Sequence, residues 1–164
     1  KYSKAMNFTY TDENGKEQYP IMGCYGIGVG RMAASICEVR HDDYGPIWPI
    51  TIAPWQVHLC CLRSDDAECK EKADEIYETL QNMGIEVIYD DRKARPGAMF
   101  ADADLLGVPV RVVVSPRNLA ENVVEISTRD KSIDKQKTPV DQAVTEVQNI
   151  INKLTADINS KVNK

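Results

Sequence analysis

The chain has 164 residues, of which 43% are hydrophobic and 27% charged, so it is long enough to bury a core and too apolar to be wholly disordered. Its 25 acidic and 20 basic residues give a net charge of −5, which excludes a generally basic nucleic-acid coat but leaves room for a local basic site. No apolar run approaches the roughly 18 residues of a membrane span. The start at Lys1 is neither a methionine nor a signal peptide, so we expect a fragment of a longer protein.

The first 46 residues indicate a β-hairpin followed by a short helix. Stretches 7–11 and 17–22 alternate in polarity around Asn14-Gly15, a pair that favours a turn with positive φ. A glycine-rich loop over 26–30 then leads into a helix that we expect to end near Val39. Its inward-facing residues are predicted to be Met32, Ile36 and Cys37.

Residues 45–54 contain three prolines, and this stretch divides the chain in our prediction. Proline fixes φ and removes a donor, so the stretch is expected to be a stiff, extended connector. We predict one domain over 1–46, a linker over 47–53 and a second domain over 54–164.

Strands and helices alternate after the connector. The predicted strands are 57–62, 85–89, 110–114 and 123–128. The predicted helices run from a Ser64 cap to Gly84, from Pro96 to Gly107, and over 139–162 after Thr138. Because residues 110–114 are almost wholly β-branched, we expect them to form a central strand buried on both faces. The alternation predicts a three-layer α/β domain with a mixed, largely parallel sheet flanked by helices.

Cysteine and histidine are too few and too scattered for metal chemistry. The five cysteines include no CxxC motif, and the only histidines are His41 and His58. Five cysteines without a CxxC motif fit a reducing cytosol or organelle matrix, so we expect free thiols and no metal site, and of the two compartments we predict the cytoplasm. We expect His41 to cap a helix end or lie on the surface and His58 to pack on its strand.

The glycine loop Gly26-x-Gly28-x-Gly30-Arg31 has three interpretations. It can be a tight turn that needs glycine for positive φ. It can be a dinucleotide-binding fingerprint, although the spacing is GxGxG instead of GxGxxG. It can also present Arg31 as a fixed cation to a phosphate or a planar base, with glycines that let the ligand approach the backbone.

Several motifs together resemble one family. Residues 20–31, PIMGCYGIGVGR, resemble motif 3 of bacterial-type prolyl-tRNA synthetases, which are class II aminoacyl-tRNA synthetases. Residues 41–49, HDDYGPIWP, resemble that family's junction into its anticodon-binding domain. YDDRKARPG at 89–97 and FADADLLGVPVRV at 100–112 match the domain itself. The resemblance covers nearly the whole chain with its motifs in order.

The resemblance implies that 1–46 is the end of a class II catalytic domain, with its β-hairpin and helix. It implies that Arg31 contacts ATP and that Gly26, Gly28 and Gly30 line the adenylate pocket. The whole enzyme is expected to be a homodimer that joins proline to its tRNA with ATP and Mg²⁺. Motifs 1 and 2 of the family are not among these residues, so we expect this polypeptide alone to bind no cofactor and make no prolyl-adenylate; proline-dependent pyrophosphate exchange would contradict this.

The resemblance also implies contacts to the anticodon of proline tRNA, whose second and third bases are both guanine. It places an aromatic, an acidic and an arginine contact on Phe100, Asp104 and Arg111. A ring can stack on an unpaired base, a carboxylate can accept from guanine N1 and N2, and a guanidinium can donate to O6 and N7. The loop residues Asp91, Arg92, Lys93 and Arg95 belong to the same predicted site, where the cations suit phosphates.

Each of these residues also has an ordinary structural interpretation. Phe100 fits a core position, Asp104 a solvated helix face and the Arg92 loop a solvated turn. Arg111, on a β-branched strand, has to find a partner or reach the surface. Met99 stands where the family usually has a basic residue. Two alternative functions stay open: a free-standing, non-catalytic accessory protein with the same domain, and a small nucleotide-binding α/β protein.

Overall fold

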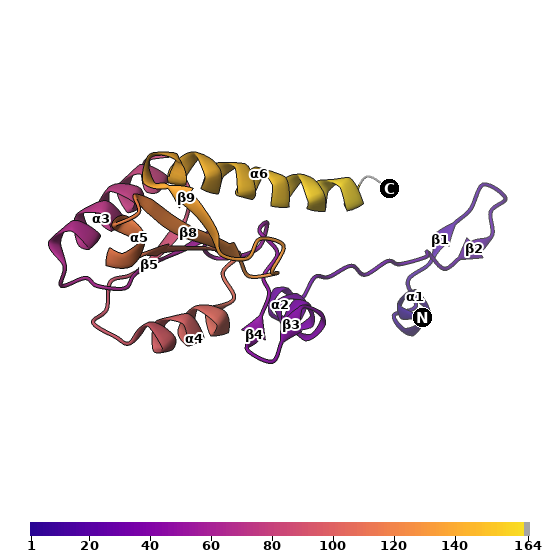
Figure 1. Ribbon diagram of the computed structural model, residues 1–164. Coiled ribbons are helices and arrows are strands. Elements are labelled where there is room, and N and C mark those ends of the chain that lie inside the picture. Colours follow the sequence, from indigo (N-terminus) through magenta and orange to yellow (C-terminus); the bar gives the residue numbers. More distant parts are fainter. Residues whose placement is uncertain (163–164) are drawn as a thin grey trace. The chain divides into compact units, whose positions relative to one another are not determined.

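The computed structural model describes residues 1–162 (Figure 1). The chain forms two compact units, residues 1–33 and the residues from Ala34 onward, each of which is described by itself. Within the described residues, every helix is too short or too polar to cross a membrane.

The first unit holds the predicted hairpin in a shorter form. Its elements are α1 (Tyr2–Ala5), β1 (Tyr10–Thr11), β2 (Glu17–Gln18) and the start of α2 (Val29–Val39). The Asp12 carboxylate accepts hydrogen bonds from the backbone N–H of Asn14 at 3.0 Å and Lys16 at 2.9 Å, which closes the turn. Gly15 alone supplies the positive φ, at +74°. The α2 prediction is confirmed; of its predicted inward-facing residues, Ile36 and Cys37 are half-buried, whereas Met32 is 51% exposed.

The proline-rich stretch is not an extended connector. Its first two residues form β4 (Gly45–Pro46), which pairs with β3 (His41–Asp42) in a two-stranded hairpin. The backbone N–H groups of Ile52 and Ala53 then donate to the carbonyl of Pro49 at 3.1 and 3.0 Å, so the chain turns there. Ile50 is 6% exposed and belongs to the main core. The turn brings this apolar side chain inward, and burial of its surface favours the compact path.

The second unit contains the predicted mixed sheet. Its strands are β5 (Val57–Cys61), β6 (Val87–Asp90), β7 (Val110–Val114), β8 (Val123–Thr128) and β9 (Gln136–Pro139). The spatial order is β6-β5-β7-β8-β9, with β5 parallel to both β6 and β7. Strand β8 is antiparallel to β7 and to β9, so it alone runs against the other four. The β-branched strand β7 lies in the middle, as predicted.

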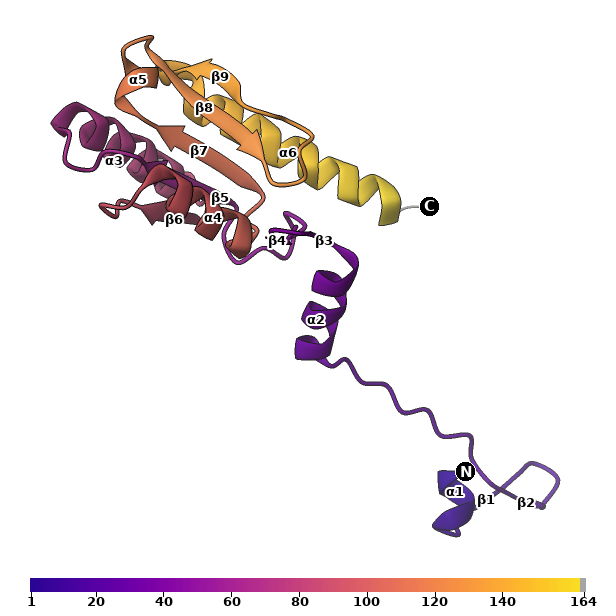
Figure 2. The ribbon, with the colours of Figure 1, turned by 60° about the horizontal axis from the view of Figure 1, so that its bottom comes forward.

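Helices cover both faces of this sheet, which confirms the three-layer prediction (Figures 1 and 2). One face carries α3 (Ala67–Asn82), α5 (Pro116–Leu119) and α6 (Ala143–Val162), and the other carries α4 (Pro96–Leu106). The main core lies beneath α3 and α6. A smaller cluster of Cys60, Met99 and Val113 lies beneath α4.

Two helix starts differ from the prediction. Helix α3 is capped by Asp66 instead of Ser64, because the Asp66 carboxylate accepts from the N–H of Cys69 at 2.9 Å. The last helix begins at Ala143, since strand β9 extends to Pro139 and one 3₁₀ turn, Val140–Gln142, follows. Strand β9 is polar and short, so it lacks the apolar alternation by which its neighbours were predicted.

The glycine that ends α4 is expected to be hard to replace. Gly107 has φ +69°, and a Cβ on it would lie 2.3 Å from the carbonyl oxygen of Pro46. Gly84 is the matched control, because its φ is +77° but a Cβ there would meet nothing within 4 Å. We expect Gly84→Ala to lower the unfolding free energy by about 1 kcal/mol, the cost of the left-handed backbone. Gly107→Ala adds a backbone clash and is expected to cost at least about 2 kcal/mol. Urea unfolding of both variants checks this, and equal losses would contradict it.

Candidate functional site

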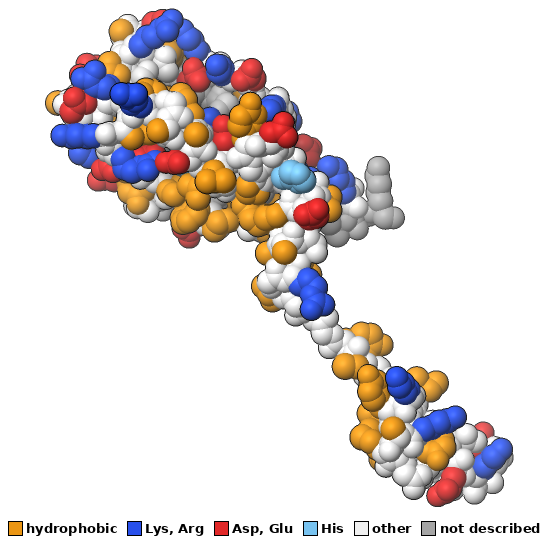
Figure 3. All heavy atoms as spheres, turned by 90° about the horizontal axis from the view of Figure 1, so that it is seen from below, with side chains coloured by type: hydrophobic (Ala, Val, Ile, Leu, Met, Phe, Trp, Pro, Cys, Tyr) orange, Lys and Arg blue, Asp and Glu red, His pale blue; other side chains and the backbone are white. Residues whose placement is uncertain are grey.

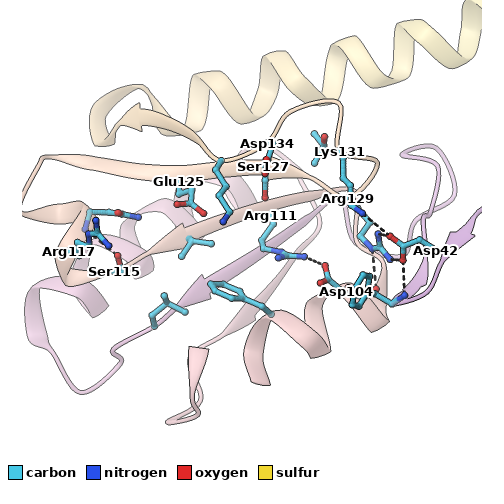
Figure 4. A pocket seen from close by; sticks show the side chains of 17 residues that line it. Asp42, Asp104, Arg111, Ser115, Arg117, Glu125, Ser127, Arg129, Lys131 and Asp134 are labelled. Atoms are coloured by element: carbon cyan, nitrogen blue, oxygen red, sulfur yellow. Dashed lines mark hydrogen bonds and ion pairs between the residues drawn. The ribbon is translucent and has the colours of Figure 1, made fainter. Parts of the chain in front are cut away.

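A cleft of about 450 Å³ lies on the α4 side of the sheet, within the second unit (Figure 4). Its walls come from α4, β7, β8, the segments after those two strands, and the β3–β4 hairpin. Its charged and hydroxyl-bearing residues include Asp104, Arg111, Arg117, Glu125, Ser127, Arg129 and Lys131. Figure 3 shows basic and acidic side chains interspersed on this side of the molecule, in keeping with a local site instead of a uniformly basic face.

Three of the predicted residues meet in this cleft. Phe100 and Asp104 lie one turn apart on α4, and Arg111 reaches them from β7. The Arg111 guanidinium forms an ion pair with the Asp104 carboxylate and lies over the Phe100 ring, with its Cζ 5.6 Å from the ring centroid. The side chains of Arg111 and Asp104 are 19% and 30% exposed, so both reach solvent at the cleft. The interpretation of Asp104 as an unpaired surface residue is therefore wrong.

The start of α4 explains how Phe100 reaches this position. Pro96 occupies the first turn, which suits its fixed φ, and Gly107 ends the helix in the left-handed conformation. Met99 is fully buried with Cys60 and Val113, which fixes the rotation of the helix about its axis. Phe100, the next residue, is half-buried against that cluster and also lines the cleft. A basic side chain at position 99 would be sealed in the core here, at a high desolvation cost.

Arg129 is a residue of the cleft that sequence reasoning missed. Its side chain is 3% exposed, and its guanidinium donates to both carboxylate oxygens of Asp42 at 2.8 and 2.6 Å. It also donates to the carbonyls of Gly45 at 3.0 Å and Asp104 at 3.2 Å. These bonds join the β3–β4 hairpin to the end of α4. Hydrogen bonding to Arg129 is the main reason that the pKa of Asp42 is well below its usual range.

The predicted loop cations lie outside the cleft. Arg92 bridges the carboxylates of Asp90 and Asp102 at 2.8 and 2.7 Å, and this pairing raises the pKa of its guanidinium. It lines a separate hollow with His58 and Leu105, among others. Asp91, Lys93 and Arg95 are exposed in the loop between β6 and α4.

The glycine loop belongs to the first unit, and residues 19–28 there have neither helix nor strand. Gly26, Gly28 and Gly30 are exposed, and none of them is among the positive-φ residues, so the tight-turn interpretation is wrong. The dinucleotide interpretation needs a preceding strand, which these described residues do not provide. Arg31 lies in the first turn of α2, so its role as a fixed cation stays a prediction.

Across the described residues, no three His, Cys, Asp or Glu side chains gather closely enough to hold a metal ion. His41 lies at the end of α2, where its Nδ1 is 3.1 Å from the carbonyl oxygen of Cys37. This is the predicted capping role.

His58 is buried as predicted, and its burial gives a pH-dependent stability. It is 2% exposed, neither ring nitrogen has a hydrogen-bond partner among the described residues, and desolvation lowers its pKa below the ordinary 6.5 despite the nearby Asp90 carboxylate. Below pH 6.5 the His58 imidazole is protonated in the unfolded chain but stays neutral in the folded chain, so the free energy of unfolding decreases as the pH falls. The expected loss is at most about 1.4 kcal/mol per pH unit. Urea unfolding at pH 7.5 and 5.5 should show a smaller loss for His58→Leu than for the wild type; equal losses would contradict this.

The mixed sheet, its two helical layers and a cleft that combines a ring, a carboxylate and a guanidinium define an α/β binding domain. Residues 56–150 match the family model described as "Anticodon binding domain". The chain belongs to the anticodon binding domain family.

Curated relatives refine this assignment. The chain is 47% identical over 149 residues to a proline–tRNA ligase of Syntrophus aciditrophicus, which covers 90% of this chain and 26% of the relative. It is 45% identical over 159 residues to a proline–tRNA ligase of Treponema denticola, covering 97% of this chain and 26% of the relative. The chain therefore spans about a quarter of the length of the curated relatives it matches. The resemblance to prolyl-tRNA synthetases is confirmed.

A solved structure shares the fold. Prolyl-tRNA synthetase from Cryptosporidium parvum, complexed with L-proline and AMP, matches with a TM-score of 0.69 at 21% identity. The match covers 99% of this chain and 36% of that one. At this identity the likeness shows the fold alone.

Proposed function

We propose that this chain recognises the anticodon of proline tRNA, as the anticodon-binding part of a proline–tRNA ligase. Its family and its relatives support the role. The observation that carries the proposal is the cluster in the cleft, where Arg111 is held between the Phe100 ring and the Asp104 carboxylate.

The cluster has the chemistry to read guanine. A guanidinium has five N–H donors, and the ion pair with Asp104 engages Arg111 through one nitrogen, so donors remain for guanine O6 and N7. The carboxylate of Asp104 can accept from guanine N1 and N2, and the ring of Phe100 can stack on an unpaired base. The loop residues Asp91, Arg92, Lys93 and Arg95 are proposed to lie along the RNA backbone.

The wider activity belongs to the same proposal. The whole enzyme would join proline to its tRNA with ATP and Mg²⁺, as a homodimer in the cytoplasm. Arg31 would contact ATP, and Gly26, Gly28 and Gly30 would line the adenylate pocket. The relatives' names and the matched structures with AMP or AMPPNP support this reading. Residues 1–46 would then be the C-terminal remnant of the catalytic domain, 47–53 a linker and 54–164 the anticodon-binding domain.

Binding of the chain to an anticodon stem-loop tests the proposal. The probe is the stem-loop of a proline tRNA, and its control is the same stem-loop with both anticodon guanines changed to adenine. We expect the control to bind at least tenfold more weakly, since each wrong base costs about 1–3 kcal/mol. Equal affinity for the two RNAs would overturn the proposal and favour the accessory-protein alternative. Micromolar ATP binding without RNA discrimination would favour the nucleotide-binding alternative.

A further inference from the structure

A second carboxylate lies in the cleft, and the cluster of Phe100, Asp104 and Arg111 does not use it. Glu125 projects from β8 on the same face of the sheet as Arg111, and Figure 4 shows both rising from neighbouring strands while Asp104 reaches in from α4. The strand register pairs Arg111 with Ser127 and Val113 with Glu125. Glu125 is therefore the diagonal neighbour of Arg111, about 7–8 Å away between Cα atoms.

Glu125 has no partner among the described residues. It is half-buried, and its carboxylate takes part in no hydrogen bond or ion pair there. Its cross-strand neighbour on β9 is Lys137, but the Lys137 ammonium is bound to Glu121 at 2.5 Å. The carboxylate of Asp104, by contrast, is already paired with Arg111. Both carboxylate oxygens of Glu125 therefore remain available as acceptors for a ligand in the cleft.

We infer that Glu125 reads one of the two anticodon guanines and that Asp104 with Arg111 reads the other; this rests on the proposed function. A carboxylate acts only as an acceptor, and guanine presents two adjacent N–H donors, N1 and N2, on its Watson–Crick edge. Adenine and cytosine each set a ring acceptor beside their amino group, so a carboxylate faces repulsion there. The hydroxyl of Ser127, between Glu125 and Lys131 along the cleft lining, can donate to the base carbonyl.

Replacement of guanine by inosine distinguishes the roles of Glu125 and Asp104, because inosine lacks only the 2-amino group of guanine. Each guanine of the proline stem-loop is replaced by inosine in turn, and binding is measured for the wild-type chain, Glu125→Gln and Asp104→Asn. We expect each inosine to weaken wild-type binding about tenfold. Glu125→Gln should lose its response to inosine at one position only, and Asp104→Asn at the other only.

Glu86→Gln is the matched control, since Glu86 is an exposed carboxylate outside the cleft lining. It should keep both inosine responses. The inference is overturned if Glu125→Gln keeps both responses, or if both variants lose the response at the same guanine. Failure of the proposed function looks different: the wild-type chain would then respond to neither inosine.

Discussion

Replacement of Arg129 by methionine is expected to lower the free energy of unfolding by about 3 kcal/mol, the low end for breaking a buried ion pair. The Arg129 side chain is 3% exposed, and its loss leaves the Asp42 carboxylate and two backbone carbonyls without their donor. The low end applies because Asp42 keeps 23% exposure and a second cation, Lys131, at 3.5 Å. Equilibrium urea unfolding at neutral pH measures the loss.

Arg63→Met is the matched control, because its ion pair with Asp65 is largely exposed, at 61% and 48% of the two side chains. Solvent screens such a pair, so we expect little measurable change. In a double-mutant cycle, Asp42→Asn combined with Arg129→Met should cost less than the sum of the single changes, since each removes the same interaction. A loss for Arg129→Met no larger than that for Arg63→Met would show that the pair does not hold the hairpin in place.

Two ion pairs of the cleft, Asp104–Arg111 and Asp42–Arg129, differ in how far they could be predicted from the sequence. Asp104 and Arg111 are seven positions apart, on a helix and the strand that directly follows it. The resemblance to the family placed both in one site, whereas helical periodicity alone favoured a solvated Asp104. Asp42 and Arg129 are 87 positions apart. Nothing local to Arg129 indicates its partner, because the sheet order that brings them together depends on the packing of the whole unit.

The same distinction holds for the fold. Strands β5 to β8 were predicted because each has an apolar run whose period is set by burial on the sheet. Strand β9, Gln136–Pro139, was missed because it lies at the edge of the sheet and is mostly polar. Glu125 was missed for a related reason: on an alternating strand an outward carboxylate is typical, and only the tertiary structure shows that this one faces a cleft.

Arg111→Ala is expected to weaken binding of the proline anticodon stem-loop by about 2 kcal/mol, roughly thirtyfold. The change removes the donors for guanine and leaves Asp104 as an unpaired negative charge beside RNA phosphates. Arg111→Lys keeps the charge but loses the planar fork, so we expect nearly the same loss and an equal loss of discrimination against the adenine-substituted stem-loop. Binding titrations at several salt concentrations measure both.

Salt dependence distinguishes base reading by Arg111 from simple charge attraction. A cation that neutralises one phosphate contributes about 0.7 to the slope of log affinity against log salt for single strands. If Arg111 acted only through its charge, Arg111→Ala would make this slope shallower and Arg111→Lys would leave it unchanged. A base-reading Arg111 instead loses affinity in both variants while the slope stays nearly constant. Arg63→Ala, an exposed arginine paired with Asp65 outside the cleft, is the control for net charge. If Arg111→Lys bound the stem-loop with wild-type affinity, Arg111 would act only through its charge, and other residues would have to account for the preference for guanine.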